Sequence, residues 1–226
     1  MKNSIILFIL FVAVAFGCSR TKDNVSVTYT PSTPLITISS AQYVSIPVGG
    51  ALPTVSATSY DTFYKQSLTN NIIIDYSNVK VDIPGFYQII VSSKNKNGYI
   101  GYGYVYVAVT NISSTVNISG HYLQMTNNDT VAVTMLAPGL YQTSNVAGVH
   151  TFDSANFITP AYFVQLSATS IVLPMQKTYF PTNNSSIDSL YGTNGSCVVS
   201  PPDTTFQYMI QNKNFGPSMR VFKKIY

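Results

Sequence analysis

The residues that could do chemistry in this chain are few, and their spacing is not that of a catalytic site. All eight acidic residues are Asp, and there are two His and two Cys. A glycosidase needs two carboxylates flanking the scissile bond, and the dispersed Asp residues offer no such pair. A Ser nucleophile usually lies on a strained Gly-x-Ser-x-Gly turn, which the sequence lacks. The sequence therefore predicts a protein without catalysis and without a cofactor.

The histidines and the second cysteine indicate packing roles. His150 and Asp153 could place two ligands near one metal, but the paired spacing of a zinc site is missing, so no metal is expected. We expect His121 to lie half-buried in or beside a strand. In Gly195-Ser196-Cys197-Val198-Val199, alternation sends Cys197 inward together with Val199. We therefore expect a small buried hydrophobe there in place of a reactive thiol.

Tyrosines are the best candidates for contact with a ligand. The chain has 17 Tyr and 12 Phe but no Trp. In residues 101–109 the period of two of a strand puts Tyr102, Tyr104 and Tyr106 on one face and three valines on the other. A row of exposed rings is an apolar platform with a polar rim, which can stack on sugars. The rings could instead pair across strands and stabilise the sheet, and the absence of Trp favours that second interpretation.

A second group of candidate binding residues lies in residues 176–196, a stretch rich in Asn, Ser and Thr. We expect a loop here, and a loop of this length in a compact domain is usually functional or disordered. Aromatic rings among amide and carboxylate groups are the mix that a saccharide site uses. The residues of this kind are Tyr179, Phe180, Tyr191, Asn183 and Asp188.

The first eighteen residues predict export and attachment to a membrane. Lys2 is a positively charged start, residues 5–16 are an unbroken apolar run, and Gly17 is the small residue before a cleavage site. A run of 12 residues is too short to span a bilayer, which takes about 20. Residues 15–18 (AFGC) resemble the bacterial lipobox, which implies a signal peptide over 1–17 and a diacylglyceryl anchor on the sulfur of Cys18. The alternative is an ordinary secretory signal with an incidental cysteine.

The composition fits an exported protein with an uncharged polar surface. Charged residues are 9% of the chain, against about 25% in an average soluble protein. The net charge of +4 comes from scattered basic residues, so no nucleic-acid partner is expected. Residues 18–33 are polar and rich in Ser and Thr, which predicts a lipidated N-terminus followed by an extended tether.

Short alternating runs bounded by turn residues predict an all-β chain. Between residues 34 and 110 we expect a sandwich, with Pro84-Gly85 as a type II turn in which Gly takes a positive φ. The expected strands there are 35–38, 43–48, 72–76, 79–81, 86–92 and 99–109. The polar segment 111–117 is the predicted linker. Beyond it, over 118–226, the strands restart as an antiparallel meander, either a curved sheet or a small barrel.

Two segments carry resemblances to known families. Residues 82–87 (DIPGFY), an alternating strand, a loop with Asn97-Gly98 and the closing run 105–109 resemble a bacterial immunoglobulin-like domain of the pesticidal crystal protein type. Such domains are mostly spacers or adhesion modules. Family members usually carry an Asp where the loop here reads Ser93-Lys94-Asn95, so no metal-binding role is carried over.

The second resemblance covers the C-terminal part. Residues 118–122 (ISGHY), 138–141 (PGLY), 145–148 (NVAG) and 221–224 (VFKK) resemble the C-terminal β-domain of two-module Bacteroidetes surface lipoproteins, whose function is unassigned. Those proteins too place a lipobox and an immunoglobulin-like domain first. The resemblance implies an outer-membrane lipoprotein, surface-exposed or facing the periplasm. Four Asp-Ser/Thr tripeptides also resemble the O-glycosylation sequon of exported Bacteroidetes proteins, with acceptors Thr130, Ser154, Ser189 and Thr204.

These observations predict a lipid-anchored cell-envelope protein that binds a glycan without catalysis. An accessory role beside an outer-membrane transporter is the expected setting. The alternative is a structural or adhesive envelope lipoprotein, in which the immunoglobulin-like domain is a spacer and the tyrosines serve packing.

Overall fold

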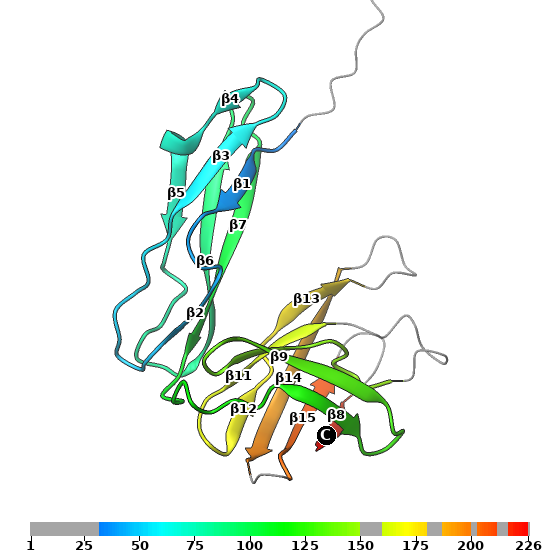
Figure 1. The fold of residues 1–226 in the computed structure, drawn as a ribbon. Helices are drawn as coiled ribbons and strands as arrows, with labels where there is room; N and C mark the ends of the chain where they lie inside the picture. Colours follow the sequence, from blue (N-terminus) through cyan, green and yellow to red (C-terminus); the bar gives the residue numbers. More distant parts are fainter. Residues whose placement is uncertain (1–31, 150–159, 180–186, 200–202, 212–216, 226) are drawn as a thin grey trace, which may run out of the picture. The chain divides into compact units, whose positions relative to one another are not determined.

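The structure is a computed structural model, and it describes residues 32–149, 160–179, 187–199, 203–211 and 217–225 (Figure 1). The predicted signal peptide, Cys18 and most of the tether lie outside these residues. Within the described residues the secondary structure is strands and one short 3₁₀ turn at Thr69–Asn71. The predicted all-β fold is confirmed, and of the two forms expected after the sandwich, a curved sheet or a small barrel, the structure has the barrel. No helix in this part of the chain is long and apolar enough to cross a membrane.

The N-terminal part is a sandwich of two sheets. One sheet has the order β1 (Leu35–Ile38), β3 (Ala57–Asp61), β4 (Gln66–Ser67). The other has the order β2 (Tyr43–Ile46), β7 (Ile100–Val109), β6 (Gly85–Lys94), β5 (Ile72–Asp75). The β2–β7 pair is parallel and the remaining pairs are antiparallel. Alternate residues of the long strands point inward, so the core between the sheets is aliphatic and consists of Ile46, Val55, Ile89, Val91, Val105, Val107 and Val109.

Several details of the sandwich differ from expectation, beginning with β3 and β4, where no strand was predicted. Residues 79–81 lie in the connection between β5 and β6 where a strand was predicted, and β2 ends at Ile46, two residues early. Gly85 does not take a positive φ, because it is already an extended residue of β6, paired with Val109. The Pro-Gly turn chemistry occurs instead at Pro138-Gly139, where Gly139 has a φ of +74° in a two-residue hairpin connection.

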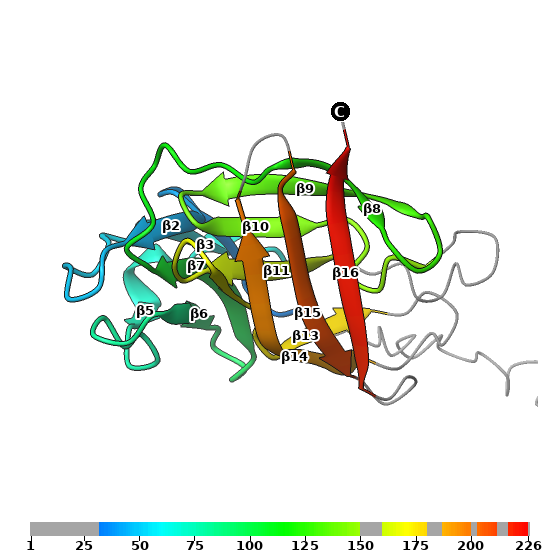
Figure 2. The ribbon, with the colours of Figure 1, turned by 90° about the horizontal axis from the view of Figure 1, so that it is seen from below.

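The C-terminal part is a closed antiparallel barrel of eight strands. The strands follow chain order around it: β8 (Gly120–Gln124), β9 (Thr130–Ala137), β10 (Leu140–Thr143), β11 (Ala161–Gln165), β12 (Ser170–Val172), β14 (Ile187–Val198), β15 (Thr205–Gln211) and β16 (Ser218–Ile225). Pairing of β12 with β14 and of β16 with β8 closes the circle. Figure 2 looks onto β14, β15 and β16, with β8 to β11 behind them.

Aromatic rings fill the barrel interior. Phe206 stacks on Phe163 at 5.5 Å and on Phe222 at 4.8 Å, and it meets Tyr122 edge-on at 4.7 Å between ring centroids. All four side chains are at most 1% exposed. The hydroxyl of buried Tyr208 donates to the carbonyl of Val146 at 2.9 Å, so its polar group is satisfied inside the apolar core. An eight-stranded barrel is just wide enough for such side chains to fill it.

The expected loop at 176–196 is wrong. This segment contains β13 (Gln176–Tyr179) and most of β14, which pair from Gln176↔Leu190 to Tyr179↔Ile187. Ser, Thr, Asn and Gly hide the alternation of β14 in the sequence. The strand forms because both barrel neighbours, β12 and β15, supply ladder partners for its second half.

A third cluster packs the outer side of the barrel onto the second sheet. It contains Ala108 from β7 and Ala137, Leu140 and Val164 from the barrel. The hydroxyl of Thr110 also donates to the carbonyl of Gln165 at 2.7 Å. The sandwich, residues 111–117 and the barrel therefore belong to one compact unit, Ser32–Tyr226.

The barrel closure depends on Gly195, which gives a first testable prediction. A Cβ on Gly195 would lie 2.4 Å from the carbonyl oxygen of Ile171, its partner across the β12–β14 pair. Gly195→Ala should therefore lower the free energy of unfolding by about 1–3 kcal/mol, the usual cost of overpacking. Urea unfolding measures this, with Ser196→Ala on the same strand as the control. Equal stability of the Gly195→Ala and control variants would contradict the described closure.

Candidate functional site

The outer face of the second sheet presents two exposed tyrosines side by side. On β7, Val105 and Val107 are fully buried, whereas Tyr102 is 56% exposed and Tyr104 is 38% exposed. The predicted division of this strand into a valine face and a tyrosine face is therefore confirmed. The tyrosines point away from the sandwich core because the valines occupy it.

The neighbouring strands add apolar and polar groups beside these rings. In the ladder, Tyr102 pairs with Ser92, which pairs with Ile73, and Ile73 is 66% exposed. The next row joins Tyr104 to Ile90, which pairs with Asp75. We call this set the tyrosine platform: Tyr102, Tyr104, Ile90, Ser92, Ile73 and Asp75. It combines two rings and two aliphatic side chains with a hydroxyl and a carboxylate.

Asp75 supplies a permanent negative hydrogen-bond acceptor at the edge of the platform. Its Oδ1 accepts a hydrogen bond from the backbone N–H of Ser77 at 2.8 Å. The hydroxyl of Ser77 and this backbone N–H stabilise the charged form and lower the pKa of Asp75 below its ordinary value. The carboxylate is therefore ionised at neutral pH.

The third predicted tyrosine, Tyr106, packs instead against other rings. Its ring stacks on Tyr43 at 5.5 Å and on Phe86 at 5.7 Å, and it lies 4.9 Å from Tyr162 of the barrel. The hydroxyls of Tyr43 and Tyr162 share a hydrogen bond of 3.2 Å. Burial raises the pKa of Tyr106 and of Tyr162. Of the two interpretations of the tyrosine row, ring pairing is therefore the one that holds for Tyr106.

Sequence reasoning missed both this ring cluster and the polar members of the platform. Tyr43 and Tyr162 are 119 residues apart, so no local pattern links them. Asp75 and Ser92 join the tyrosines only through the β5–β6–β7 register. The available signal was the alternation in residues 72–75, which places Ile73 and Asp75 on one face and Ile72 and Ile74 in the core.

The second predicted group is described only in part. Tyr179 lies in β13, and Asp188 and Tyr191 lie in β14, but their side chains are outside the described part of the chain. Phe180 and Asn183 are outside it altogether. The described members of this group, Tyr179, Asp188 and Tyr191, thus belong to the paired strands β13 and β14.

The predicted modification sites differ in accessibility. Thr130, the first residue of β9, is exposed, whereas Thr204 is 5% exposed, so the folded chain does not present the Thr204 hydroxyl. Ser189 lies in β14, and Ser154 is outside the described residues. His121, which was expected to be half-buried, is exposed on β8, and His150 lies outside the described residues. Among the described residues no three His, Cys, Asp or Glu gather as metal ligands would.

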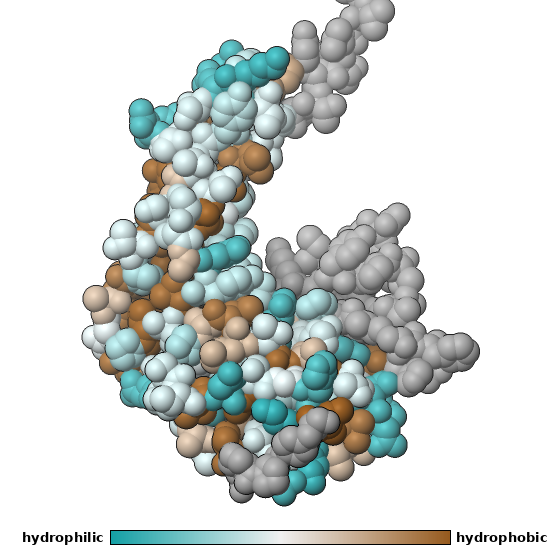
Figure 3. Space-filling view, in the orientation of Figure 1, coloured by the Kyte–Doolittle hydropathy of each residue, from teal (hydrophilic) through white to brown (hydrophobic). Residues whose placement is uncertain are grey.

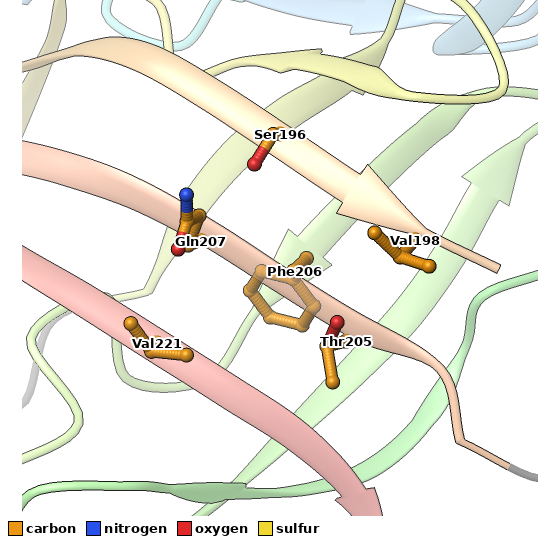
Figure 4. Close-up of a pocket in the computed structure, with 6 residues that line it drawn as sticks. All are labelled: Ser196, Val198, Thr205, Phe206, Gln207 and Val221. Carbon is orange, nitrogen blue, oxygen red and sulfur yellow. The ribbon is translucent and has the colours of Figure 1, made fainter. Parts of the chain in front are cut away.

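Two recesses lie elsewhere on the surface. One, of about 120 Å³, is lined by Ser196, Val198, Thr205, Phe206, Gln207 and Val221 from three neighbouring barrel strands (Figure 4). Its volume is below the roughly 300–1,000 Å³ of typical ligand pockets. The other, of about 280 Å³, is lined by Ser45, Ile46, Pro47, Thr110, Asn111, Ile112, Ser114 and Pro138. Neither contains an exposed aromatic ring, which leaves the tyrosine platform as the better binding surface.

Cys197 is buried in the barrel as predicted, paired with Phe206 across β14 and β15. Val199, which was expected to point inward with it, is 38% exposed because β14 ends at Val198. Burial raises the pKa of the Cys197 thiol from the ordinary value of 9.0 to about 11. The thiol is a packing group.

This burial predicts the reactivity of Cys197. In a Cys18→Ser background, the native thiol should react with iodoacetamide at pH 8 about a hundredfold more slowly than the urea-unfolded chain, because its thiolate fraction is smaller. The raised pKa also implies that stability from the protonated thiol is complete below pH 9 and is lost as the pH rises toward 11. Mass spectrometry of the alkylated protein measures the rate. Rapid native labelling would mean that Cys197 is accessible.

Comparison with known proteins gives distant structural likenesses, among them the following two. No family model and no curated protein matches the chain. One similar structure is the lipoprotein BT2262 from Bacteroides thetaiotaomicron, with 15% identity, a TM-score of 0.39 and coverage of 85% of this chain and 100% of that one. Another, from Clostridium perfringens ZmpB, comprises CBM51-2 in complex with GlcNAc and INT domains. It has 11% identity and a TM-score of 0.28, and the match covers 84% of this chain and 41% of that one. At these TM-scores neither likeness carries an argument about function.

Proposed function

We propose that this chain is a lipid-anchored binding protein of a bacterial cell envelope that holds carbohydrate on the tyrosine platform, without catalysis. The observation that carries the proposal is the exposure of Tyr102 and Tyr104 on a sheet whose inner face is fully packed. Because Tyr102 and Tyr104 are two residues apart on one strand, their side chains are about 7 Å apart. One extended oligosaccharide can therefore lie across both rings.

The chemistry of the platform suits a sugar. The C–H face of a pyranose stacks on an aromatic ring, and its hydroxyls need hydrogen-bond partners at the ring's edge. Ser92 can donate or accept, and the ionised carboxylate of Asp75 accepts. Ile73 and Ile90 extend the apolar floor between these groups.

Carbohydrate binding predicts a specific mutational pattern. Tyr102→Ala and Tyr104→Ala should each weaken binding about two- to tenfold, as loss of one ring contact does, and the double variant should abolish it. Affinity electrophoresis and glycan arrays with the mature chain measure this. Tyr60→Ala is the matched control, because Tyr60 is 44% exposed on β3 of the opposite sheet. Glycan binding that survives the double variant would exclude the platform.

The anchor is supported by the lipobox-like segment ahead of Cys18, with an acyl-modified sulfur holding the chain at the outer membrane. Cys18→Ser should therefore move the protein from the membrane fraction to the soluble fraction and remove labelling by radioactive palmitate. At least two acyl chains are needed for stable anchoring, which a mature bacterial lipoprotein has. Retention of the Cys18→Ser protein in the membrane, with palmitate still incorporated, would place the modification elsewhere.

A second candidate function is a structural or adhesive envelope protein. The observation in its favour is the ring cluster of Tyr43, Phe86, Tyr106 and Tyr162. These rings pack the sandwich against the barrel, and a rigid spacer needs such a fixed junction. In that case the chain binds no glycan, and the Tyr102→Ala and Tyr104→Ala variants behave like the parent protein in the glycan-binding assays. A transporter in the same membrane is the partner expected only for the first function, and co-purification with the lipidated chain tests it.

A further inference from the structure

The chain enters the fold at one end of the sandwich, where it is held tightly. The carbonyl oxygen of Ser32 accepts a hydrogen bond from Nδ2 of Asn95 at 3.0 Å. Asn95 is itself 5% exposed, and its Oδ1 accepts from the backbone N–H groups of Asn97 and Tyr99. The carbonyl of Pro34 lies so close to Gly101 that a Cβ there would be 1.9 Å from its oxygen. The point at which the N-terminal segment leaves the fold is therefore fixed beside the β6–β7 loop.

Two loops form a single surface at this end. Nδ2 of Asn97, in the β6–β7 loop, donates to the hydroxyl of Tyr64, in the β3–β4 turn, at 2.7 Å. From the same loop, Nζ of Lys96 lies 3.5 Å above the centre of the Tyr64 ring. Phe63 packs edge-on against Tyr64 at 4.7 Å. We call this surface the sandwich tip: Phe63, Tyr64, Lys65, Lys94, Lys96 and Tyr99.

The tip is positively charged. Lys65, Lys94 and Lys96 are exposed, whereas neither connection contains an acidic residue and Asp61, at the end of β3, is 0% exposed. Its Oδ1 accepts from the backbone N–H groups of Phe63 and Tyr64, so this carboxylate serves the turn. Figure 3 shows strongly hydrophilic residues gathered at the end of the sandwich that bears β4.

Rings stand among these lysines. Phe63 is 38% exposed and Tyr99 is 40% exposed, and Ile100 next to Tyr99 is 41% exposed. Protein surfaces that lie at the boundary of the lipid headgroups combine lysines with partly exposed aromatic and aliphatic side chains, as this surface does.

The length of chain ahead of Ser32 places a membrane within reach. Thirteen residues separate Cys18 from Ser32, and fully extended they span at most about 50 Å. We propose that the sandwich tip docks onto the anionic headgroups of the same membrane leaflet that holds the acyl anchor on Cys18. This inference rests on the lipid anchor proposed above, and it assigns the lysines and rings of the tip to the bilayer.

Docking of the tip leaves the tyrosine platform accessible. Along β7, Tyr102 lies about 7 Å and Tyr104 about 13 Å from Ile100, at a rise of about 3.3 Å per residue. Both rings face sideways from the sheet, so a glycan can reach them while the tip contacts the headgroups.

Because the chain has no Trp, the fluorescence of a single introduced Trp reports on the surroundings of that position alone. The lipidated Phe63→Trp protein is reconstituted into vesicles of phosphatidylglycerol, phosphatidylethanolamine and a brominated phosphatidylcholine. We expect its emission to shift to the blue and to be quenched at least twofold by the bromine. Leu52→Trp is the matched control: Leu52 is 44% exposed and follows β2, whose last residue pairs with Val109 at the opposite end of β7. This control should show neither effect.

The charge requirement is tested in the Phe63→Trp background. Replacing Lys65, Lys94 and Lys96 together by Gln should remove most of the quenching, and the triple Arg variant should retain it. In the parent Phe63→Trp protein, about 1 M salt, which shortens the Debye length to about 3 Å, should act like the Gln variant.

The outcomes separate the tip from the anchor. Co-flotation of the protein with vesicles but no quenching of the Phe63→Trp variant overturns tip docking and leaves the anchor intact. Equal quenching of the Leu52→Trp control, or unchanged quenching in vesicles without phosphatidylglycerol, also overturns it. Failure of the lipidated chain to co-float overturns the anchor, and tip docking with it.

Discussion

Burial of the β7 valines is the constraint on which the rest of the structure depends. Val105, Val107 and Val109 are fully buried between the two sheets of the sandwich. Since side chains alternate along a strand, a slip of one residue would put the valines in solvent and the tyrosines in the core. The cost of that exchange holds the register of the ten-residue β6–β7 ladder. The outward direction of Tyr102 and Tyr104 follows from this register.

The outward side of β7 then changes character along its length. It begins at Ile100 beside the tip, continues through Tyr102 and Tyr104 on the platform, and passes to Tyr106 in the ring cluster. It ends at Ala108, which is fully buried against the barrel. One strand therefore connects the sandwich tip, the tyrosine platform and the junction with the barrel, and its exposure falls from the platform to the junction.

The barrel takes a supporting part in this arrangement. Closure leaves no unpaired ladder edge among its eight strands, and rings occupy the interior where a ligand would otherwise lie. Its outer face meets the sandwich through Val164 and Leu140, and its β11 contributes Tyr162 to the ring cluster. The barrel thus stabilises one end of the second sheet, and Tyr102 and Tyr104, which lie beyond that end, stay exposed.

Local pattern alone was sufficient for part of this protein. The all-β class, the two faces of β7 and the inward position of Cys197 all follow from a period of two combined with the burial of apolar side chains. The lipobox-like segment predicts an anchor without any knowledge of the fold.

Only the tertiary structure decided that β14 is a strand, because its partners β12 and β15 supply the hydrogen bonds that its Ser- and Asn-rich sequence does not signal. It also decided that Asp75 and Ser92 stand beside Tyr104 and Tyr102, and that Tyr106 is covered by rings from distant strands. Those contacts depend on ladder register between residues far apart in the chain, and no local pattern carries that information.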